Sequence, residues 1–228
     1  MTIFRFTLLK GLKNPLTLIF NCILPIGLVL IRPIWADNAR LGYTLIIMLM
    51  WGGAYLMSLG ILSDKANGTI VRILVAPVTM FNYLSQSLLA FMMPLIVQIL
   101  LLSVVGAILY NWTLTFFLAL ALCYIVFTIS AVSMGFAWNC LFKDREQSSS
   151  IFLALITFGS FLSGAIFPLE FFPQPIQYVG AILPAFWAVR AVNELLDFGV
   201  IFNYWIALLI MLLLAVIFLF YGGKRKLI

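Results

Sequence analysis

Residues that could carry out acid–base, metal or nucleophilic chemistry are few in this chain, and they are spread along its length. The chain has no histidine, and its seven acidic residues are Asp37, Asp64, Asp144, Glu146, Glu170, Glu194 and Asp197. These acids form no convincing general acid–base pair, and the common routes to an activated nucleophile need a histidine. The three cysteines, Cys22, Cys123 and Cys140, lack CxxC spacing, so neither a zinc site nor a disulfide framework is expected. We therefore expect the chain not to be an enzyme.

Energy for uphill transport would have to come from another polypeptide. The sequence contains no GxxxxGK[ST] phosphate-binding loop, so no nucleotide cofactor is expected in this chain. A proton- or ion-coupled carrier normally holds its ion with an acid or base inside the membrane, and no charged residue lies in the middle of an apolar segment. This lack of mid-span charge does not exclude a carrier that coordinates sodium with backbone carbonyls.

The composition is that of a polytopic membrane protein. Hydrophobic residues make up 65% of the 228 residues and charged residues only 9%, far from the balance of soluble domains. We predict an all-α fold with six membrane-spanning helices and no separate soluble domain. The expected spans are Pro15–Ile34, Leu41–Leu62, Leu84–Tyr110, Leu114–Leu141, Ile151–Phe167 and Tyr204–Tyr221.

The distribution of lysine and arginine predicts the orientation. With the amino terminus inside, ten of the 13 lysines and arginines lie on the cytoplasmic side, and only Arg32, Arg40 and Arg190 lie outside. Both termini are therefore expected in the cytoplasm, in a multi-pass protein of the inner or plasma membrane. The net charge of +6 reflects this bias, so no nucleic-acid partner is expected. The first apolar run lacks a small-x-small cleavage site and is expected to be a retained span.

Residues 1–14 have the pattern of a helix that lies in the membrane interface. Phe4, Leu8 and Gly11 fall on one helical face, whereas Lys10 and Lys13 fall on the other. The alternative is an ordinary cytoplasmic flank of the first span. Either way, this segment is expected to contact membrane lipids.

The loop after the second span contains more structure than a connection requires. Gly68 and Thr69 indicate a turn and a helix start, residues 70–76 a short amphipathic helix, and Pro77 its end. The loop could simply connect two spans. A compact helix that carries Arg72 beside Ile73 is, however, suited to docking into a groove of a soluble partner.

The chain resembles the permease subunits of type-2 ABC exporters over nearly its whole length. The resemblance rests on the stretch LSGAIFPLEFFP and on seven landmarks of this loop, namely Asp64, Lys65, Gly68, Thr69, Ala76, Pro77 and Val78. In that family the first cytoplasmic loop, residues 63–83 here, forms a coupling helix that docks on an ATP-binding subunit. The resemblance implies ATPase contacts at Asp64, Lys65, Gly68, Thr69, Arg72, Ile73 and Pro77. It also implies two ATP-binding subunits, which carry ATP and magnesium, and a second permease subunit, identical or related.

The second cytoplasmic loop, FKDREQSSS from Phe142, has two equally good interpretations. Lys143 and Arg145 either make a second contact with the ATPase or only anchor a solvated turn.

The prolines and glycines of residues 168–196 predict a broken membrane segment. Proline interrupts a helix, and irregular backbone at membrane depth is tolerated only where protein or a wet cavity surrounds it. The resemblance implies a re-entrant hairpin that acts as an outer gate, with gate residues Phe167, Pro168, Glu170, Phe171, Phe172 and Pro173. The alternative is an external loop with an interfacial helix. The chain departs from the family in having Arg190 and then Asn193 where an acid and an arginine are usual.

The expected function is export of an apolar or amphipathic substrate, such as a drug, lipid or peptide, driven by ATP hydrolysis on the partner. Alternatives are polysaccharide export by the same type of permease, a nucleotide-independent carrier or channel, and a structural or assembly protein of the membrane.

Overall fold

The structure is a computed structural model that describes residues 2–13, 17, 19–31, 39–69, 80–167 and 169–224. Throughout these residues every regular element is a helix, which confirms the prediction of an all-α fold. The elements are α1 (Thr2–Leu12), the π-helix η1 (Ile19–Ile23), α3 (Leu24–Leu30), α5 (Ala39–Ala66), α7 (Met80–Tyr110), α8 (Leu114–Asn139), α9 (Arg145–Leu162), the 3-10 helix η3 (Leu169–Phe171), α10 (Gln174–Gly180), α11 (Pro184–Asp197) and α12 (Phe202–Lys224).

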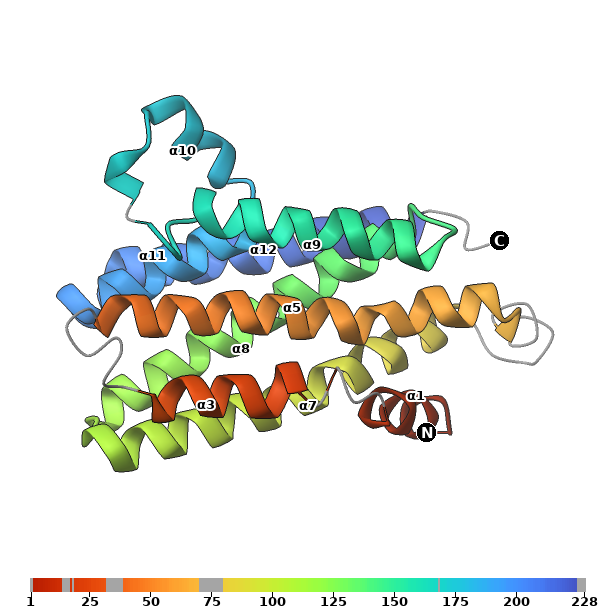
Figure 1. Ribbon diagram of the computed structural model, residues 1–228, viewed down its shortest axis with the longest axis horizontal. Coiled ribbons are helices and arrows are strands. Elements are labelled where there is room, and N and C mark those ends of the chain that lie inside the picture. The colour runs from red at the N-terminus through yellow and green to blue at the C-terminus, as the bar shows by residue number, and fades with distance from the viewer. Residues whose placement is uncertain are drawn as a thin grey trace.

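Helix α8 lies in the middle of the bundle and contacts α5, α7, α11 and α12. Its buried face carries many small side chains, among them Ala119, Ala131 and Ser130. Small residues let neighbouring helices approach closely, which is how helices pack in a membrane where no hydrophobic effect drives them together. The long helices consequently run side by side in a single bundle (Figure 1).

The bundle has two distinct ends, which Figure 1 separates along its long axis. At the "α1 end", α1 lies across the bundle and contacts α7 and α5, and the turn between α8 and α9 lies at the same end of the bundle. At the "α10 end" lie the start of α5, the turn between α11 and α12, and α10, which projects from the bundle and contacts α9.

Four helices are long and apolar enough to cross a membrane: Arg40–Lys65, Gln86–Leu109, Leu114–Asn139 and Phe202–Gly222. They correspond to the second, third, fourth and sixth of the expected spans. A fifth candidate exists if α10 and α11 are counted together as one bent span. The described residues therefore support four or five spans, and six spans stay a prediction.

The expected fifth span begins earlier than its apolar stretch predicted. Asp144 caps α9 by accepting a hydrogen bond from the Glu146 N–H at 3.1 Å, so the helix starts at Arg145. Its first turns therefore consist of the polar run REQSSS, and the helix ends at Leu162 rather than Phe167. Because of this polar start, α9 is not among the helices apolar enough to cross a membrane.

The expected first span, Pro15–Ile34, is described only in part. The described residues form a π-helix, η1, that leads directly into the seven-residue α3. Residues 14–16, 18 and 32–38 lie outside the described part of the chain, so the length of this span is not tested.

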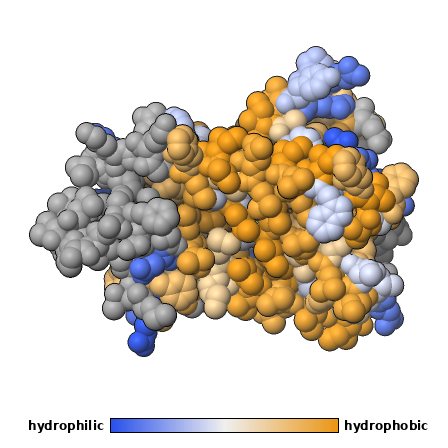
Figure 2. Space-filling model, turned by 180° about the vertical axis from the view of Figure 1, so that it is seen from behind, coloured by the Kyte–Doolittle hydropathy of each residue, from blue (hydrophilic) through white to orange (hydrophobic). Residues whose placement is uncertain are grey.

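The surface carries a broad apolar band. Figure 2 shows apolar side chains over the middle of one face, with hydrophilic residues gathered toward the two ends. Helix α7 contributes exposed apolar residues at a spacing of three or four, namely Leu89, Met93, Val97, Leu100, Val104 and Ile108. A stripe of this kind on a long helix is suited to contact with lipid chains.

Candidate functional site

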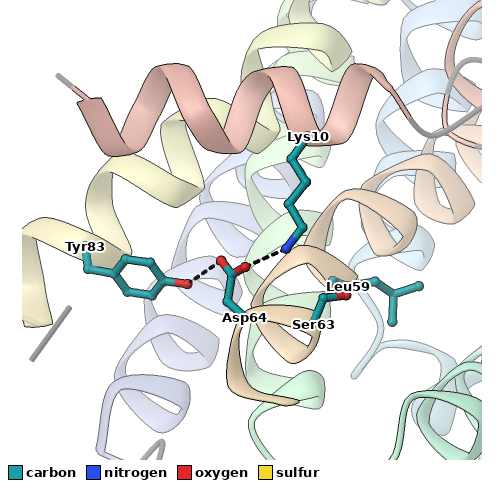
Figure 3. A network of polar contacts seen from close by, with 5 residues as sticks. All are labelled: Lys10, Leu59, Ser63, Asp64 and Tyr83. Carbon is teal, nitrogen blue, oxygen red and sulfur yellow. Dashed lines mark hydrogen bonds and ion pairs between the residues drawn. The ribbon is translucent and has the colours of Figure 1, made fainter. Parts of the chain in front are cut away.

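A single carboxylate joins three helices at the α1 end. The Asp64 side chain is only 9% exposed, and one of its oxygens accepts a hydrogen bond from the Lys10 ammonium at 2.5 Å. Its other oxygen accepts from the Tyr83 hydroxyl at 2.9 Å. Figure 3 shows Lys10 reaching from α1 and Tyr83 from α7, with Asp64 in the last turn of α5 between them. We call these three residues the Asp64 joint.

Local structure fixes the position of the joint. Helix α5 ends at Ala66, and Gly68 then has a φ of +66°, in the left-handed region where glycine is favoured. The Gly68 N–H donates to the Lys65 carbonyl at 3.2 Å, which closes the turn after the helix. Tyr83 lies in the first turn of α7, so Asp64 and Tyr83 stand on the two flanks of the 63–83 loop.

Tyr83 is held as a hydrogen-bond donor. Burial, together with the negative charge of the neighbouring Asp64 carboxylate, raises the pKa of the Tyr83 phenol far above its ordinary value. The phenol stays protonated, and its O–H donates the hydrogen bond to Asp64. The Asp64 carboxylate, with Lys10 and Tyr83 as donors, has a partner for each oxygen.

A second polar cluster joins α5, α8 and α9. The Asn139 amide donates to the Ser58 hydroxyl at 2.8 Å and accepts from the Ser148 hydroxyl at 2.8 Å. The Ser148 oxygen in turn lies 3.1 Å from the Tyr55 hydroxyl. Each of these side chains is buried, so the bonds form without competition from water. The cluster fixes how α8 and α9 sit against α5.

The α10 end is built differently. Helices α10 and α11 meet at 105°, and α11 buries one face against α12, α8 and α5. The Trp187 indole N–H donates to the Ala181 carbonyl at 2.8 Å, across the bend between the two helices. A methyl group on Gly180 would collide with the Leu162 carbonyl oxygen, so α10 passes very close to the end of α9.

Comparison with protein families identifies the family of the chain that adopts this arrangement. Residues 37–223 match the model of the ABC-2 family transporter proteins, which is most of the chain. The chain belongs to the ABC-2 transporter family. A comparison with curated proteins returned no match. The molecule is thus a multi-pass membrane permease of the ABC type, and members of this family are membrane subunits that are generally not catalytic themselves.

The structure places the predicted residues of the first loop in two groups. The Asp64 side chain is buried within the permease, where it bonds to Lys10 and Tyr83. Lys65 is half-buried in the last turn of α5. Gly68 and Thr69 are half-buried in the turn that follows. Arg72, Ile73 and Pro77 lie outside the described residues.

In the second loop, Lys143 and Arg145 are both exposed, but they differ in their surroundings. Arg145 lines the same cavity as Lys10 and Asp64, whereas Lys143 is not part of its wall. The fold therefore brings the start of α9 close to the Asp64 joint.

The predicted gate residues lie around the turn that leads into α10. Phe167 and Phe171 are exposed, at 51% and 78%, while Phe172 is half-buried. Pro173 is exposed and directly precedes α10. Glu170 belongs to the 3-10 helix η3, and Pro168 lies outside the described residues. The Gln177 amide donates to the carbonyls of Leu169 and Phe172, which ties this turn to α10.

Sequence reasoning missed Lys10 and Tyr83 as partners of Asp64. Lys10 was predicted to lie on the polar face of an interfacial helix, and Tyr83 was the last residue of the predicted 63–83 loop, with no role assigned to it. A signal was present, because a lone acid at the end of an apolar helix needs a partner when it is buried. The sequence could not say which of the nearby basic residues would supply it.

Proposed function

We propose that the permease is the membrane-spanning subunit of an ATP-driven exporter. Two ATP-binding subunits would dock on the 63–83 loops of two permease subunits, identical or related. The ATP-binding subunits would carry ATP and magnesium and perform the hydrolysis. Membership of the ABC-2 family supports partnership with ABC ATPases.

The Asp64 joint is the observation that carries the proposed mechanism. It ties both flanks of the 63–83 loop to each other and to α1 through one carboxylate. A load applied to the loop therefore moves α5, α7 and α1 together rather than bending the loop alone. In this mechanism, closure of the ATPase pair displaces the loop, and the bundle opens toward the α10 end.

The α10–α11 pair is proposed to be the re-entrant outer gate. Its 105° bend and the burial of α11 between α12, α8 and α5 are the supporting observations. The exposed aromatic rings of Phe167 and Phe171 suit the membrane–water interface. The cargo is proposed to be apolar or amphipathic, such as a drug, lipid or peptide.

Crosslinking tests the docking of the loop. Single cysteines at Thr69 or Arg72 should crosslink to an ATP-binding subunit that copurifies with the permease. Separately, bulky replacements of Gly68 and Thr69 should leave membrane insertion intact while uncoupling ATP hydrolysis from transport. A cysteine at Asn111, in the turn between α7 and α8, is the control that should not crosslink. Absence of crosslinks from both loop positions would refute the docking site, and solute movement by the purified permease alone would favour a nucleotide-independent carrier.

Orientation is tested by labelling in a background that lacks the native cysteines. Cysteines at Glu170 and Asp197 should react with an impermeant thiol reagent from outside, and a cysteine at Arg225 only after permeabilisation. Labelling of Arg225 from outside would overturn the proposed cytoplasmic position of the loop and of both termini.

A further inference from the structure

A cavity of about 360 Å³ lies beside the Asp64 joint, between α1, α5, α7 and the start of α9. Its volume falls in the range of small-molecule sites, roughly 300 to 1,000 Å³. We call it the α1 cavity. The exporter mechanism proposed above and the role of the α1 cavity are independent of each other.

Positive charge dominates the wall of the α1 cavity. Lys10, Lys13 and Arg145 line it, against a single carboxylate, Asp64. Lys10 is already paired with Asp64. In the described part of the chain, neither Lys13 nor Arg145 has a carboxylate within ion-pair distance, so two exposed cations from different elements line this space without an ion-pair partner.

Hydroxyl groups add neutral donors to these cations. Thr7 of α1 and Thr17 also line the cavity, and both side chains are buried, at 5% and 1% exposure. Cations combined with hydroxyl donors are the chemistry that recognises a phosphate group, whose oxygens accept several hydrogen bonds at once.

Apolar side chains of α5 and α7 form much of the remaining wall, and the Ser63 hydroxyl of α5 adds one polar group to it. Leu56, Met57 and Leu59 come from α5, and Phe91 from α7. Outside the cavity, α1 exposes Phe6 at 64% and Leu9 at 48%. A free phosphate ion would gain nothing from this apolar wall, whereas a lipid places a phosphate beside a glycerol and acyl chains.

We propose that the α1 cavity binds the phosphate group of an anionic membrane lipid, with Lys13 and Arg145 as its charged contacts and the apolar wall against the glycerol and upper acyl chain. The same phosphate chemistry could come from a soluble phosphate ester, so the test separates the two sources. The site lies next to the Asp64 joint, and a bound lipid would touch α1, α5 and α9 at once.

The test measures lipid binding to the purified full chain in neutral detergent by native mass spectrometry. Phosphatidylglycerol carries both the phosphate and the chains, diacylglycerol has the chains without phosphate, and glycerol phosphate has the phosphate without chains. We expect retained phosphatidylglycerol, no comparable retention of diacylglycerol, and no displacement of the lipid by glycerol phosphate at equal concentration.

Matched charge variants locate the site. Lys13→Gln with Arg145→Gln removes both cavity cations, whereas Arg5→Gln with Lys143→Gln removes two exposed cations of the same segments that do not line the cavity. A cation near a lipid phosphate contributes about 1 kcal/mol to the binding free energy, which is about fivefold in affinity. Loss of both cavity cations should therefore weaken phosphatidylglycerol binding about 25-fold. The control pair should weaken it about twofold or less.

Three results would overturn the proposal. Equal weakening by the two pairs would mean diffuse attraction to a basic surface, and equal retention of diacylglycerol would mean that no phosphate is recognised. Displacement by glycerol phosphate at equal concentration would assign the site to a soluble phosphate ester. If the double variant does not fold, as judged by its unfolding midpoint in lipid-free detergent, each single variant should still weaken binding about fivefold.

Discussion

Two ion pairs lie at opposite ends of the described bundle, and their surroundings differ. At the α1 end, Lys10 and Asp64 have side chains that are 35% and 9% exposed, and Tyr83 donates a further hydrogen bond. At the α10 end, Arg40 and Asp197 are 55% and 34% exposed. Both pairs bridge helices far apart in sequence, but only the first has a carboxylate withdrawn from water.

Hydrogen bonds between elements occur at both ends. In the α1 half they form the Asp64 joint and the cluster around Asn139. Near the start of α5 and of α12, at the α10 end, three buried hydroxyls donate to backbone carbonyls of other segments: Thr44 to Ala165, Tyr124 to Tyr43 and Tyr204 to Ala119. The difference therefore lies in the acceptor, which is a buried carboxylate in the Asp64 joint and a neutral carbonyl in these three bonds. A hydrogen bond to an ionised acceptor is stronger than one to a neutral acceptor.

The largest expected effect distinguishes the two ion pairs. Asp64→Ala leaves the Lys10 ammonium and the Tyr83 hydroxyl without their acceptor, and loss of one partner from a buried pair costs about 3–5 kcal/mol. Because Lys10 is 35% exposed and can regain water, we expect the lower end, about 3 kcal/mol. The measurement is the free energy of unfolding in mixed detergent micelles.

Asp197→Ala is the matched control for this variant. It removes the same type of residue from the exposed pair, and such pairs contribute about 0–1 kcal/mol. Equal losses from the two variants would break the comparison between the two ends.

The next effect tests packing at the α10 end. In Gly180→Ala the added methyl group meets the Leu162 carbonyl, a backbone atom that cannot rotate away, so we expect a loss of about 2 kcal/mol. Gly27→Ala is the control, because no atom lies within 4 Å of the new methyl group. Its unfolding free energy should stay level or rise by up to about 1 kcal/mol, since alanine is the better helix former. Identical behaviour of the two alanine variants would contradict the close approach of α9 and α10.

A smaller effect is expected in the polar cluster of α5, α8 and α9. Asn139→Ala removes two hydrogen bonds, to Ser58 and from Ser148. Interhelical hydrogen bonds in membranes average about 0.6 kcal/mol each, so the loss should be about 1 kcal/mol. Thr157→Val, on the exposed face of α9, should change the unfolding free energy little, because Thr157 bonds only within its own helix. A loss of less than half the expected value would mean that the cluster does not hold these helices.

The smallest effect concerns the bend between α10 and α11. Trp187→Phe keeps an aromatic ring but removes the hydrogen bond to the Ala181 carbonyl, which should cost about 0.6 kcal/mol. Trp205→Phe on α12, whose side chain is 49% exposed, serves as the control. If Trp187→Phe is no worse than the control, the bend is fixed by its backbone and not by this bond.

Several features could be predicted from the sequence because they depend on composition and local order. Apolar runs of membrane length marked α5, α7, α8 and α12, and the lack of charge within them identified a membrane protein. Asp64, Gly68 and Thr69, with the later LSGAIFPLEFFP stretch, pointed to the family whose model matches residues 37–223. The interruption near Pro173 and Pro184 was also visible, since proline cannot continue a helix.

Other features were decided by the tertiary structure. That Asp64 faces Lys10 and Tyr83 depends on α1 lying across the end of the bundle, and helical periodicity alone placed Lys10 on the polar face. The early start of α9 follows from the cap at Asp144, which competes with the apolar pattern that begins at Ile151. A side chain's partner is set by which helices meet, and the sequence of one helix specifies only the faces it offers. For this permease the sequence determined which segments are apolar, and the packing of the helices determined which polar groups they bury together.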